Sequence, residues 1–421
     1  MTSMPATAAR ANPPAPPGAL FAGIDTHKNT HHVAIIDHVG RSVQDREFPT
    51  TSRGYQQIME FLNSHGAIER VGIEGTGSYG AGIARVLSVG SFTVVEVARQ
   101  NRQARRLKGK SDPLDAHQAA VSVLAGTDAA TPKSGDGEVE SLRILMSERH
   151  SAGKARSQTM NQIHSLLITA PEAVRSDYRA LTSLKLVPIL ARTRPRSGID
   201  PENIARQTLK RLAARHVALA AEIAIIDQQL DALVRDVNPT LLSVGGVGVV
   251  TAATLLIVAG DNPERLTTKA AFAAMAGVAP IPASSGQRVR RRLSRGGNRN
   301  ANSALHRIVL LRMRHREPRT MAYFERRRAQ GLTDRDIRRC LKRHIANEIF
   351  AVLTSPSPET SIGQELRTRR QQTGTPITIL AASLGVPYQR LRRLEIGTRA
   401  DPQLEQLVTA ALDQIATPET A

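Results

Sequence analysis

Short apolar runs alternate with amphipathic stretches over the first third of the chain. Five of these runs have the alternating or continuous apolar character that is typical of strands: LFAGID, HHVAIIDHV, SVQDREF, RVGIEG and FTVVEVA. Patterns with a helical period lie between them, over residues 54–63 and 79–89. We therefore expect an α/β domain over residues 20–128.

From about residue 137 to residue 237 the pattern changes to long helices. A heptad repeat with a single polar member, His216, runs through Leu209, Leu212, His216, Leu219, Ile223, Ile226, Leu230, Leu233 and Val237. A weaker apolar stripe runs through Leu142, Leu145, Ile163 and Leu166. These repeats predict a coiled-coil arm, which packs either back on itself or on another subunit.

The stretch Leu241–Gly260 carries no charge over twenty residues, so a membrane span has to be weighed. Its four glycines and three hydroxyl residues argue against a span. The segment LLSVGGVGVVTAATLL instead resembles a helix-hairpin-helix, in which glycine amides, here those of Gly246 and Gly248, approach a phosphate without side-chain obstruction. A tight turn between two helices with no ligand is the alternative.

Charge adds a partner to this picture. The 421 residues hold 57 Lys and Arg against 37 Asp and Glu, a net charge of +20. From Gly286 to Arg316 there are ten arginines and no acid. Such a concentrated patch favours a polyphosphate partner, above all nucleic acid. An anionic membrane face is the less favoured partner, because the chain has no Trp and no basic helix with aromatic anchors.

The cysteine count and the N-terminal residues indicate the cellular compartment. Cys340 is the only cysteine, which excludes intramolecular disulfides and thiolate zinc sites and favours a reducing environment. Residues 1–19 lack the apolar core of a signal peptide and are typical of a disordered Pro/Ala leader. We expect a cytoplasmic protein that associates with the nucleoid.

Carboxylates stand where strands end. Gly-Ile-acid closes two of the predicted strands, at Asp25 and at Glu74, where loss of hydration costs several kcal/mol unless a partner compensates. In SDPLDAHQAA, Pro113 starts a helix that holds Asp112 and Asp115 on one face of its first turn. Taken alone, this is an ordinary helix N-terminus. Taken together, the four acids predict a site for a hard cation such as Mg²⁺, as one ion or as a pair that clamps a phosphoryl transfer.

Two further motifs leave alternatives open. His27, His31 and His32 follow Asp25, and alternation within a solvated strand explains them better than a ligand role. Ser284-Ser285-Gly286 precedes the arginines. It is either a phosphate-binding turn, or one of its two serines is a nucleophile. The neighbouring arginines could stabilise a pentavalent phosphate, although sequence physics does not choose between the two serines or between the two roles.

The last part of the chain has a separate pattern. Glu365–Leu412 is similar to an Xre-type helix-turn-helix, with ILAASLGV as first helix and turn and Tyr388–Ile396 as the helix that enters the major groove. A small helical bundle for protein contacts would show the same pattern.

Several of these stretches together identify a family. AGIDTHKNTHHVAIID, GIEGTGSYGAGIARVL, RRLKGKSDPLDAHQAA, FAAMAGVAPIPASSG, RGGNRNANSALHRIVLLRMR and RCLKRHIANEI, in this order over residues 20–352, resemble the insertion-sequence-110 family of transposases, relatives of the Piv invertase. The resemblance implies an RNase H-like (RuvC-like) N-terminal domain with a D-E-D-D tetrad at Asp25, Glu74, Asp112 and Asp115. It also implies a catalytic serine that maps onto Ser285, with Ser284 as the second register.

The same resemblance implies partners. These are DNA at the element ends and target, a non-coding bridge RNA that pairs with both, and a homo-oligomer, dimer or tetramer, with active sites shared between subunits. The expected architecture is α/β followed by α: a leader (1–19), the RNase H-like domain (20–128), a coiled-coil arm (137–237), a mostly helical transposase domain (238–353) and a helix-turn-helix domain (360–418). We expect nucleic-acid contacts from Gly246, Gly248, Arg288, Arg290, Arg291, Arg292, Arg295, Arg299, Gln389, Arg390, Arg392 and Arg393.

Three functions are compared on this basis. The first is an RNA-guided serine transposase that cuts and rejoins DNA through a phosphoserine link. The second is a metal-dependent, resolvase-like endonuclease without a covalent intermediate. An actin-like phosphotransferase is the third, and it is disfavoured because its second phosphate loop and adenosine segment are missing from the sequence.

Overall fold

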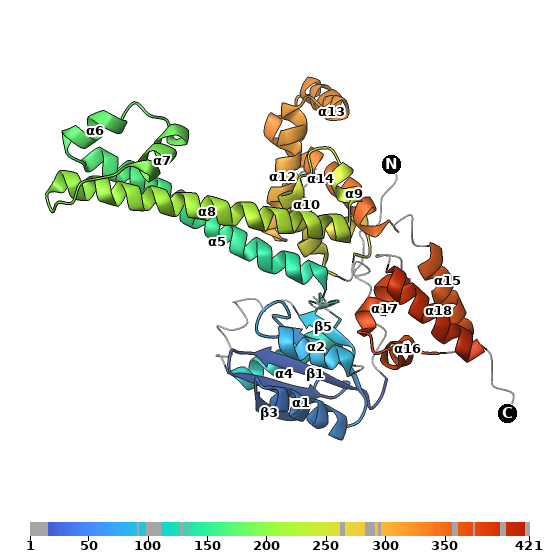
Figure 1. The fold of residues 1–421 in the computed structure, drawn as a ribbon. Coiled ribbons are helices and arrows are strands. Elements are labelled where there is room, and N and C mark those ends of the chain that lie inside the picture. The colour runs from blue at the N-terminus through green and yellow to red at the C-terminus, as the bar shows by residue number, and fades with distance from the viewer. Residues whose placement is uncertain are drawn as a thin grey trace. The chain divides into compact units, whose positions relative to one another are not determined.

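The computed structural model describes residues 16–90, 92–97, 111–126, 129–133, 135, 137–261, 266–282, 291–293, 296–355, 361–373, 375–395 and 401–416. The chain divides into two compact units. One contains Met1–Gly137, Gly260–Thr267 and Pro356–Ala421, and the other contains Glu138–Ala259 and Thr268–Ser355. We describe the N-terminal part, the helical unit and the C-terminal part each by itself (Figure 1). Most of the predicted leader lies outside the described residues.

The N-terminal part is built on a mixed sheet. Among the described residues it has six strands in the order β3-β2-β1-β4-β5-β6. The strands are β1 (Leu20–Thr26), β2 (Thr30–Ile36), β3 (Ser42–Pro49), β4 (Ile68–Glu74), β5 (Val94–Val97) and β6 (Ala129–Ala130). β1 to β3 form an antiparallel meander, β1, β4 and β5 are parallel, and β6 is antiparallel to β5. This mixed α/β arrangement is compatible with an RNase H-like domain, and it contains the five predicted strands.

Helices cover both faces of this sheet. They are α1 (Ser52–Ser64), α2 (Ala81–Val89) and α4 (Asp112–Leu124). Ile24 and Ile73 belong to a core that includes side chains of α1 and α2. Phe21 lies on the opposite face of the sheet, in a second apolar cluster that includes Val123 of α4. Because successive side chains of a strand alternate between faces, Gly23 and Asp25 lie on the α4 side with Phe21.

The arm is a hairpin of two long helices, α5 (Glu138–Thr169) and α8 (Pro201–Val237), which lie side by side (Figure 1). Its apolar seam includes Leu142 and Ile163 of α5 and Leu230 of α8, all fully buried. Arg149 of α5 adds an ion pair across it, since its Nη2 donates to Asp227 of α8 at 3.1 Å. The arm therefore packs back on itself within one chain, which chooses between the two packings that the sequence left open.

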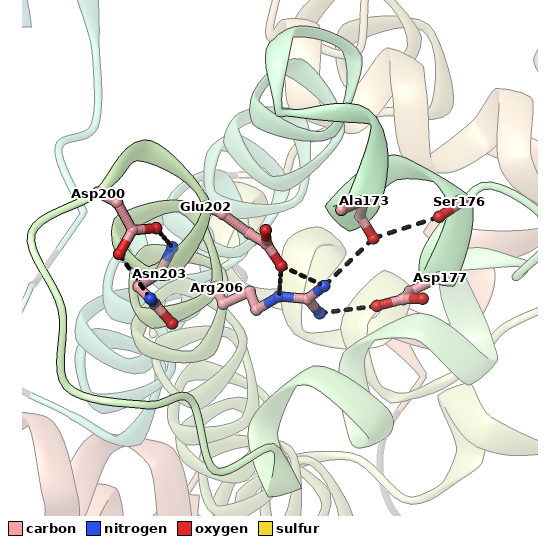
Figure 2. Close-up of polar contacts among 7 residues, drawn as sticks. All are labelled: Ala173, Ser176, Asp177, Asp200, Glu202, Asn203 and Arg206. Atoms are coloured by element: carbon pink, nitrogen blue, oxygen red, sulfur yellow. Dashed lines mark hydrogen bonds and ion pairs between the residues drawn. The ribbon is translucent and has the colours of Figure 1, made fainter.

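The tip of the arm is closed by α6 (Glu172–Tyr178) and α7 (Ser183–Arg192). Figure 2 shows how Arg206 of α8 fastens α6: its guanidinium donates to Asp177 at 2.7 Å and to the carbonyl of Ala173 at 3.2 Å. Asp200 caps α8 by accepting from the backbone N–H of Asn203 at 3.0 Å. The α6–α7 connection is thus bound to the start of α8 by polar as well as apolar contacts.

The rest of the helical unit packs around α12 and α14. Its elements are α9 (Thr240–Ser243), α10 (Val249–Ala259), α11 (Lys269–Met275), β7 (Pro280–Pro282), β8 (Arg291–Leu293), α12 (Arg299–Arg314), α13 (Pro318–Ala329) and α14 (Asp334–Thr354). Phe272, Leu305, Ile308 and Ile349 are fully buried in it. In the described part of the chain, no helix has both the length and the apolar character to cross a bilayer.

The C-terminal part consists of α15 (Ser361–Gln372), α16 (Ile377–Ser383), α17 (Tyr388–Glu395) and α18 (Pro402–Ala416) around one apolar cluster. The turn between α16 and α17 has Gly385 at φ +64, a conformation that favours glycine. Val386 closes the turn by donating its N–H to the carbonyl of Ala381 at 3.0 Å. A buried bidentate ion pair joins Arg370 of α15 to Glu395 of α17 at 2.6 and 2.8 Å.

Candidate active site

Two parallel strands bring acids to one edge of the sheet. In the register of β1 and β4, Ile24 pairs with Ile73, so Asp25 and Glu74 follow at neighbouring positions. The two strand ends are tied together, because Thr26 Oγ1 donates to the carbonyl of Glu74 at 2.8 Å. Acids that end parallel strands in adjacent register share one edge of the sheet.

Helix α4 brings the other two acids, and glycine makes its approach possible. A Cβ on Gly23 would lie 2.2 Å from the carbonyl oxygen of Ala116 and 2.3 Å from the N of Ala120, both in α4. Gly72 of β4 is equally tight, at 2.3 Å from a methyl of Val123. Only strands without side chains at these two positions allow α4 to lie this close. The first turn of α4, with Asp112 and Asp115, is thereby brought to the acid edge.

His27 lies between two of the acids. Its Nδ1 is 3.7 Å from Asp25 Oδ2 and 3.6 Å from Asp112 Oδ2. Ligand atoms of Asp25, His27 and Asp112 all lie within 4.8 Å of one another, a spacing that fits a divalent metal ion. Among the described residues, Asp25, His27 and Asp112 are the group of His, Cys, Asp or Glu side chains whose ligand atoms lie close enough together to hold one metal ion. Glu74 and Asp115 share the same edge without joining the triad.

Asp25 is poorly accommodated without a cation. Its side chain is 10 % exposed, and its Oδ2 is buried with no hydrogen-bond partner among the described residues. Burial raises the pKa of Asp25, and the charges of Asp115, Asp112 and Glu74 raise it further, whereas His27 lowers it. All four acids of the predicted tetrad therefore act on one electrostatic site. A buried carboxylate oxygen without a donor is the kind of ligand that a hard divalent cation takes.

The histidines differ from the sequence-based expectation of a solvated strand. His31 is fully buried and stacks on Tyr55 with 5.8 Å between ring centroids, and burial lowers its pKa. His32 is 9 % exposed and its Nε2 lies 2.6 Å from Asp45. The expectation was wrong for both residues, because β2 lies inside the sheet between β1 and β3. A ligand role for His27 was weighed from the sequence and set aside, although its position two residues after Asp25 at a strand end was a signal in its favour.

The predicted nucleophile lies outside the described residues. Ser284 and Ser285, with Arg288, Arg290 and Arg295, fall in the segments that the structure does not describe. The flanking strands are described: β7 and β8 pair antiparallel, with Pro282 opposite Arg291 and Ile281 opposite Arg292. The serine segment thus connects two paired strands. Arg299 is exposed at the first position of α12.

The glycine-rich hairpin separates into two roles. Gly246 has φ +82, and a Cβ there would lie 3.2 Å from the carbonyl of Ile308, so this glycine is needed for the turn and its packing on α12. Gly248 has nothing within 4 Å of a Cβ position and lies just before α10. The hairpin is also held by Arg312, whose Nε donates to the carbonyl of Gly245 at 2.7 Å. Of the two predicted contact residues, Gly248 has the open surroundings that a phosphate needs.

The predicted contact residues of the C-terminal part lie on α17. Arg390 forms an ion pair with Asp401 at 2.7 Å, and Arg392 donates to the hydroxyl of Tyr388 at 3.0 Å. Gln389 and Arg393 are on the same helix, with side chains outside the described set. Arg390 therefore has a structural partner that any nucleic acid would have to compete with.

Comparison with known proteins places the chain among transposases. Residues 22–170 match the family model for IS110 transposases of the DEDD type, described as "Transposase", and residues 238–325 match the model described as "Transposase IS116/IS110/IS902 family". An uncharacterized 43.6 kDa protein of insertion element IS110 from Streptomyces coelicolor is 26% identical over 79% of this chain and 94% of its own length. A protein of the same species, named as a candidate mini-circle transposase for IS117, is 25% identical over 79% of this chain and 92% of its own. An uncharacterized 42 kDa protein of IS900 from Mycobacterium paratuberculosis is 22% identical over 79% and 95%.

An acidic edge that could hold a divalent metal ion, on a mixed α/β domain followed by an arginine-rich helical unit, fits an enzyme that acts on DNA. The family matches identify the kind of DNA-acting enzyme. The chain belongs to the IS110 family of insertion-sequence transposases and is a DNA transposase.

Proposed function

We propose that the chain cuts and rejoins DNA through a serine–DNA phosphodiester, with Mg²⁺ bound by an RNase H-like tetrad of Asp25, Glu74, Asp112 and Asp115. The observation that carries the metal half is the buried, unpartnered Oδ2 of Asp25 in the field of the other three acids. When bound, Mg²⁺ would supply Lewis-acid stabilisation of the charge that develops on the phosphate oxygens.

The serine half of the proposal uses Ser285. Its Oγ bonds to phosphorus while the bond from phosphorus to the 3′ oxygen breaks, and the proton that leaves Oγ is balanced by one taken up at the 3′ oxygen. The products are a 5′-phosphoserine and a free 3′ hydroxyl. Attack by the 3′ hydroxyl of another strand then restores Ser285 and rejoins DNA. The phosphodiester count is conserved, so no external energy source is required.

The second candidate is a resolvase-like endonuclease in which water replaces the serine. The two are separated by the Ser285→Ala variant, with Ser284→Ala as its matched control. On a denaturing gel we expect the Ser285→Ala protein to bind DNA and give no covalent protein–DNA adduct. An adduct that persists in Ser285→Ala and disappears in Ser284→Ala moves the nucleophile by one residue. Cleavage with no adduct in the unaltered protein favours the endonuclease.

A bridge RNA is proposed as the guide. The support is the family membership together with the net charge of +20, which suits a protein that neutralises many phosphates. In such systems base pairing rather than side chains reads the target. Purifying the protein from cells that carry the whole element and sequencing the bound RNA tests this. One discrete RNA from the element is expected, and a heterogeneous RNA background contradicts guidance.

A homo-oligomer, dimer or tetramer, is proposed as the active form. The arm tip supports it, because Ile168, Leu184 and Ile199 are 73%, 86% and 96% exposed there. These exposed apolar side chains come from the end of α5, from α7 and from the segment before α8, and they offer apolar area that another copy of the chain could cover. Replacing Leu184 and Ile199 by Ser should lower the mass measured in solution, and an unchanged mass would place the association elsewhere.

The C-terminal part is proposed to bind DNA as a helix-turn-helix. The short α16, the Gly385 turn and α17 give the expected order, and α17 carries Gln389 and Arg393. Footprinting on the element ends and the promoter of the element should show a protected site that is lost in a Gln389→Ala, Arg393→Ala double variant. A footprint that is unchanged in this variant would assign the domain to protein contacts.

A further inference from the structure

A basic cavity lies between α12 and α14, and its lining includes Arg299, one of the predicted nucleic-acid contact residues. Its volume is about 440 Å³. Each helix contributes one face: Asn302 and His306 come from α12, and Arg335, Arg338, Arg339 and Lys342 come from α14. The four α14 residues are spaced i, i+3, i+4 and i+7, so they form one stripe along the helix. Among the described residues that line the cavity, none is an acid.

The floor of the cavity holds a buried ammonium in a fixed position. Lys342 is 8% exposed, and its Nζ donates to Asn302 Oδ1 at 2.8 Å. The amide of Asn302 is oriented by the backbone, because its Nδ2 donates to the carbonyls of Ala276 at 3.2 Å and Gly277 at 2.9 Å. Asn302 therefore turns its oxygen to Lys342, and a neutral amide leaves the positive charge of Lys342 uncompensated.

Arg338 is also incompletely neutralised. Its Nε is buried without a hydrogen-bond partner among the described residues, and its Nη2 lies 4.0 Å from Asp334. Asp334 is already engaged by Arg328, which donates to both of its carboxylate oxygens at 2.7 and 2.8 Å. The acid nearest to Arg338 thus has a closer partner, and the guanidinium remains able to bind another anion.

The electrostatics of the cavity repeat this imbalance. Burial lowers the pKa of Lys342, and the charge of Arg339 lowers it further. Burial also lowers the pKa of His306, with added contributions from Lys342 and Arg338. Arg339 is paired with Asp336 at 2.8 Å, so the cations left without a close acid are Lys342 and Arg338. Like charges held together in a cavity destabilise the fold, and an anion that binds between these two side chains would offset that cost.

The wall of the cavity is backbone that cannot carry side chains. A Cβ on Gly297, which has φ +87, would lie 2.6 Å from the N of Gly277. Asn298 continues this contact by donating its N–H to the carbonyl of Met275. Gly296 and Gly297 follow the end of β8 by three and four residues, a reach of roughly 10 to 14 Å. The cavity is thus close along the chain to the segment that carries Ser285.

We infer that this cavity binds a backbone phosphate of DNA, held by Lys342 and Arg338. A phosphodiester suits it better than a nucleotide base, because the described lining offers no Phe or Tyr to stack on and no carboxylate to pair with a base. The contact is therefore sequence-independent and positions the strand. The inference rests on the DNA transposase activity and not on Ser285 as nucleophile.

Binding of the full-length protein to a short DNA duplex of arbitrary sequence, followed by fluorescence anisotropy across a salt series, tests the inference. Lys342→Met and Arg338→Gln should each weaken binding about tenfold and reduce the salt slope by about one. Arg215→Gln is the matched control, since it removes the same charge from an exposed position of α8, outside both the cavity and the arginine-rich stretch Gly286–Arg316. Lys342→Arg should recover part of the affinity.

Each outcome decides the matter. Pocket variants that bind as tightly as the Arg215→Gln control overturn the inference. So does a loss confined to single-stranded RNA of the same length, which would make the cavity an RNA site. If Lys342→Met lowers the melting temperature, Arg338→Gln decides instead, because its side chain is 38% exposed. Ser285→Ala should bind DNA normally, so failure of the serine assignment would appear in the adduct and not in these affinities.

Discussion

Gly23 of β1 lies directly against Ala116 of α4, so that a methyl group on Gly23 would be 2.2 Å from the carbonyl oxygen of Ala116. The first turn of α4 carries Asp112, and its distance from Asp25 depends on this contact. Gly23 therefore controls the acid site without belonging to it.

We predict that Gly23→Ala destabilises the N-terminal part by at least about 2 kcal/mol, because α4 has to move away from the strand. The same movement should remove the metal response of the protein. Gly77→Ala is the control, since no atom lies within 4 Å of a Cβ there. Thermal unfolding with and without MgCl₂ measures both effects, and equal stability of the two variants would contradict the close contact.

Asp25→Asn should have opposite effects on stability and on activity. The buried carboxylate has a raised pKa, chiefly through desolvation, so replacing it by a neutral amide should stabilise the metal-free protein by about 1 kcal/mol. Strand exchange should be lost, and Mg²⁺ should no longer raise the melting temperature. Glu47→Gln, at an exposed position of β3, should change neither. A destabilised Asp25→Asn protein that still responds to Mg²⁺ would contradict the assignment of Asp25 as a ligand.

Glu395→Gln should unfold the C-terminal part first. Glu395 is 2% exposed and forms a bidentate pair with Arg370, and removing one partner of a buried pair costs about 3–5 kcal/mol. The matched change, Asp413→Asn, breaks the more exposed pair with Arg369 and should cost about 0–1 kcal/mol. Hydrogen exchange resolved along the chain measures the two losses, which should be confined to residues of α15–α18. Similar effects of the two variants would place the Arg370 pair in solvent.

His216 should make the arm sensitive to acid. Burial lowers its pKa, and the charge of Arg156 lowers it further. Because the unfolded arm binds a proton more readily than the folded arm, stability is lost as the pH falls through 6.5, the ordinary value, toward the lower folded value. His216→Leu, which completes the heptad, should gain about 1 kcal/mol and lose this pH dependence. His216→Asn should lose the pH dependence alone. Melting temperatures at pH 5 and pH 7.5 test both variants, and unchanged pH dependence would assign it to another group.

The sequence indicated that two strands end in acids, because both are apolar runs closed by the same Gly-Ile-acid pattern, whereas the parallel pairing that puts these ends at one edge comes from the structure. It did not predict β6, which has two residues and no period to detect. The burial of His31 and His32 depends on the order of strands in the sheet, which no local pattern encodes. The heptad repeat predicted the helical arm. It did not show which helix packs against α8, because that depends on contacts between residues far apart in the sequence, such as Arg149 and Asp227.

The basic cavity was the least accessible to sequence reasoning. The count of arginines drew attention to Gly286–Arg316, whereas the buried ammonium comes from Lys342, beyond that stretch. Its unusual state depends on Asn302, forty positions earlier, and on two carbonyls that fix the amide. A lysine on an amphipathic helix gives no sign of such a partner until the helices are packed.

The antiparallel pairing of α5 and α8 makes the arm a ruler. Each residue adds 1.5 Å along a helix. Removing one heptad from α5 and one from α8 at the same level therefore shortens the arm by about 10 Å and keeps the apolar seam in register. Removing it from one strand alone shifts every later layer against its neighbour. The length of the arm, from its base to the tip that Arg206 fastens, can therefore change without disturbing the seam only when the same seven-residue step is made in both helices.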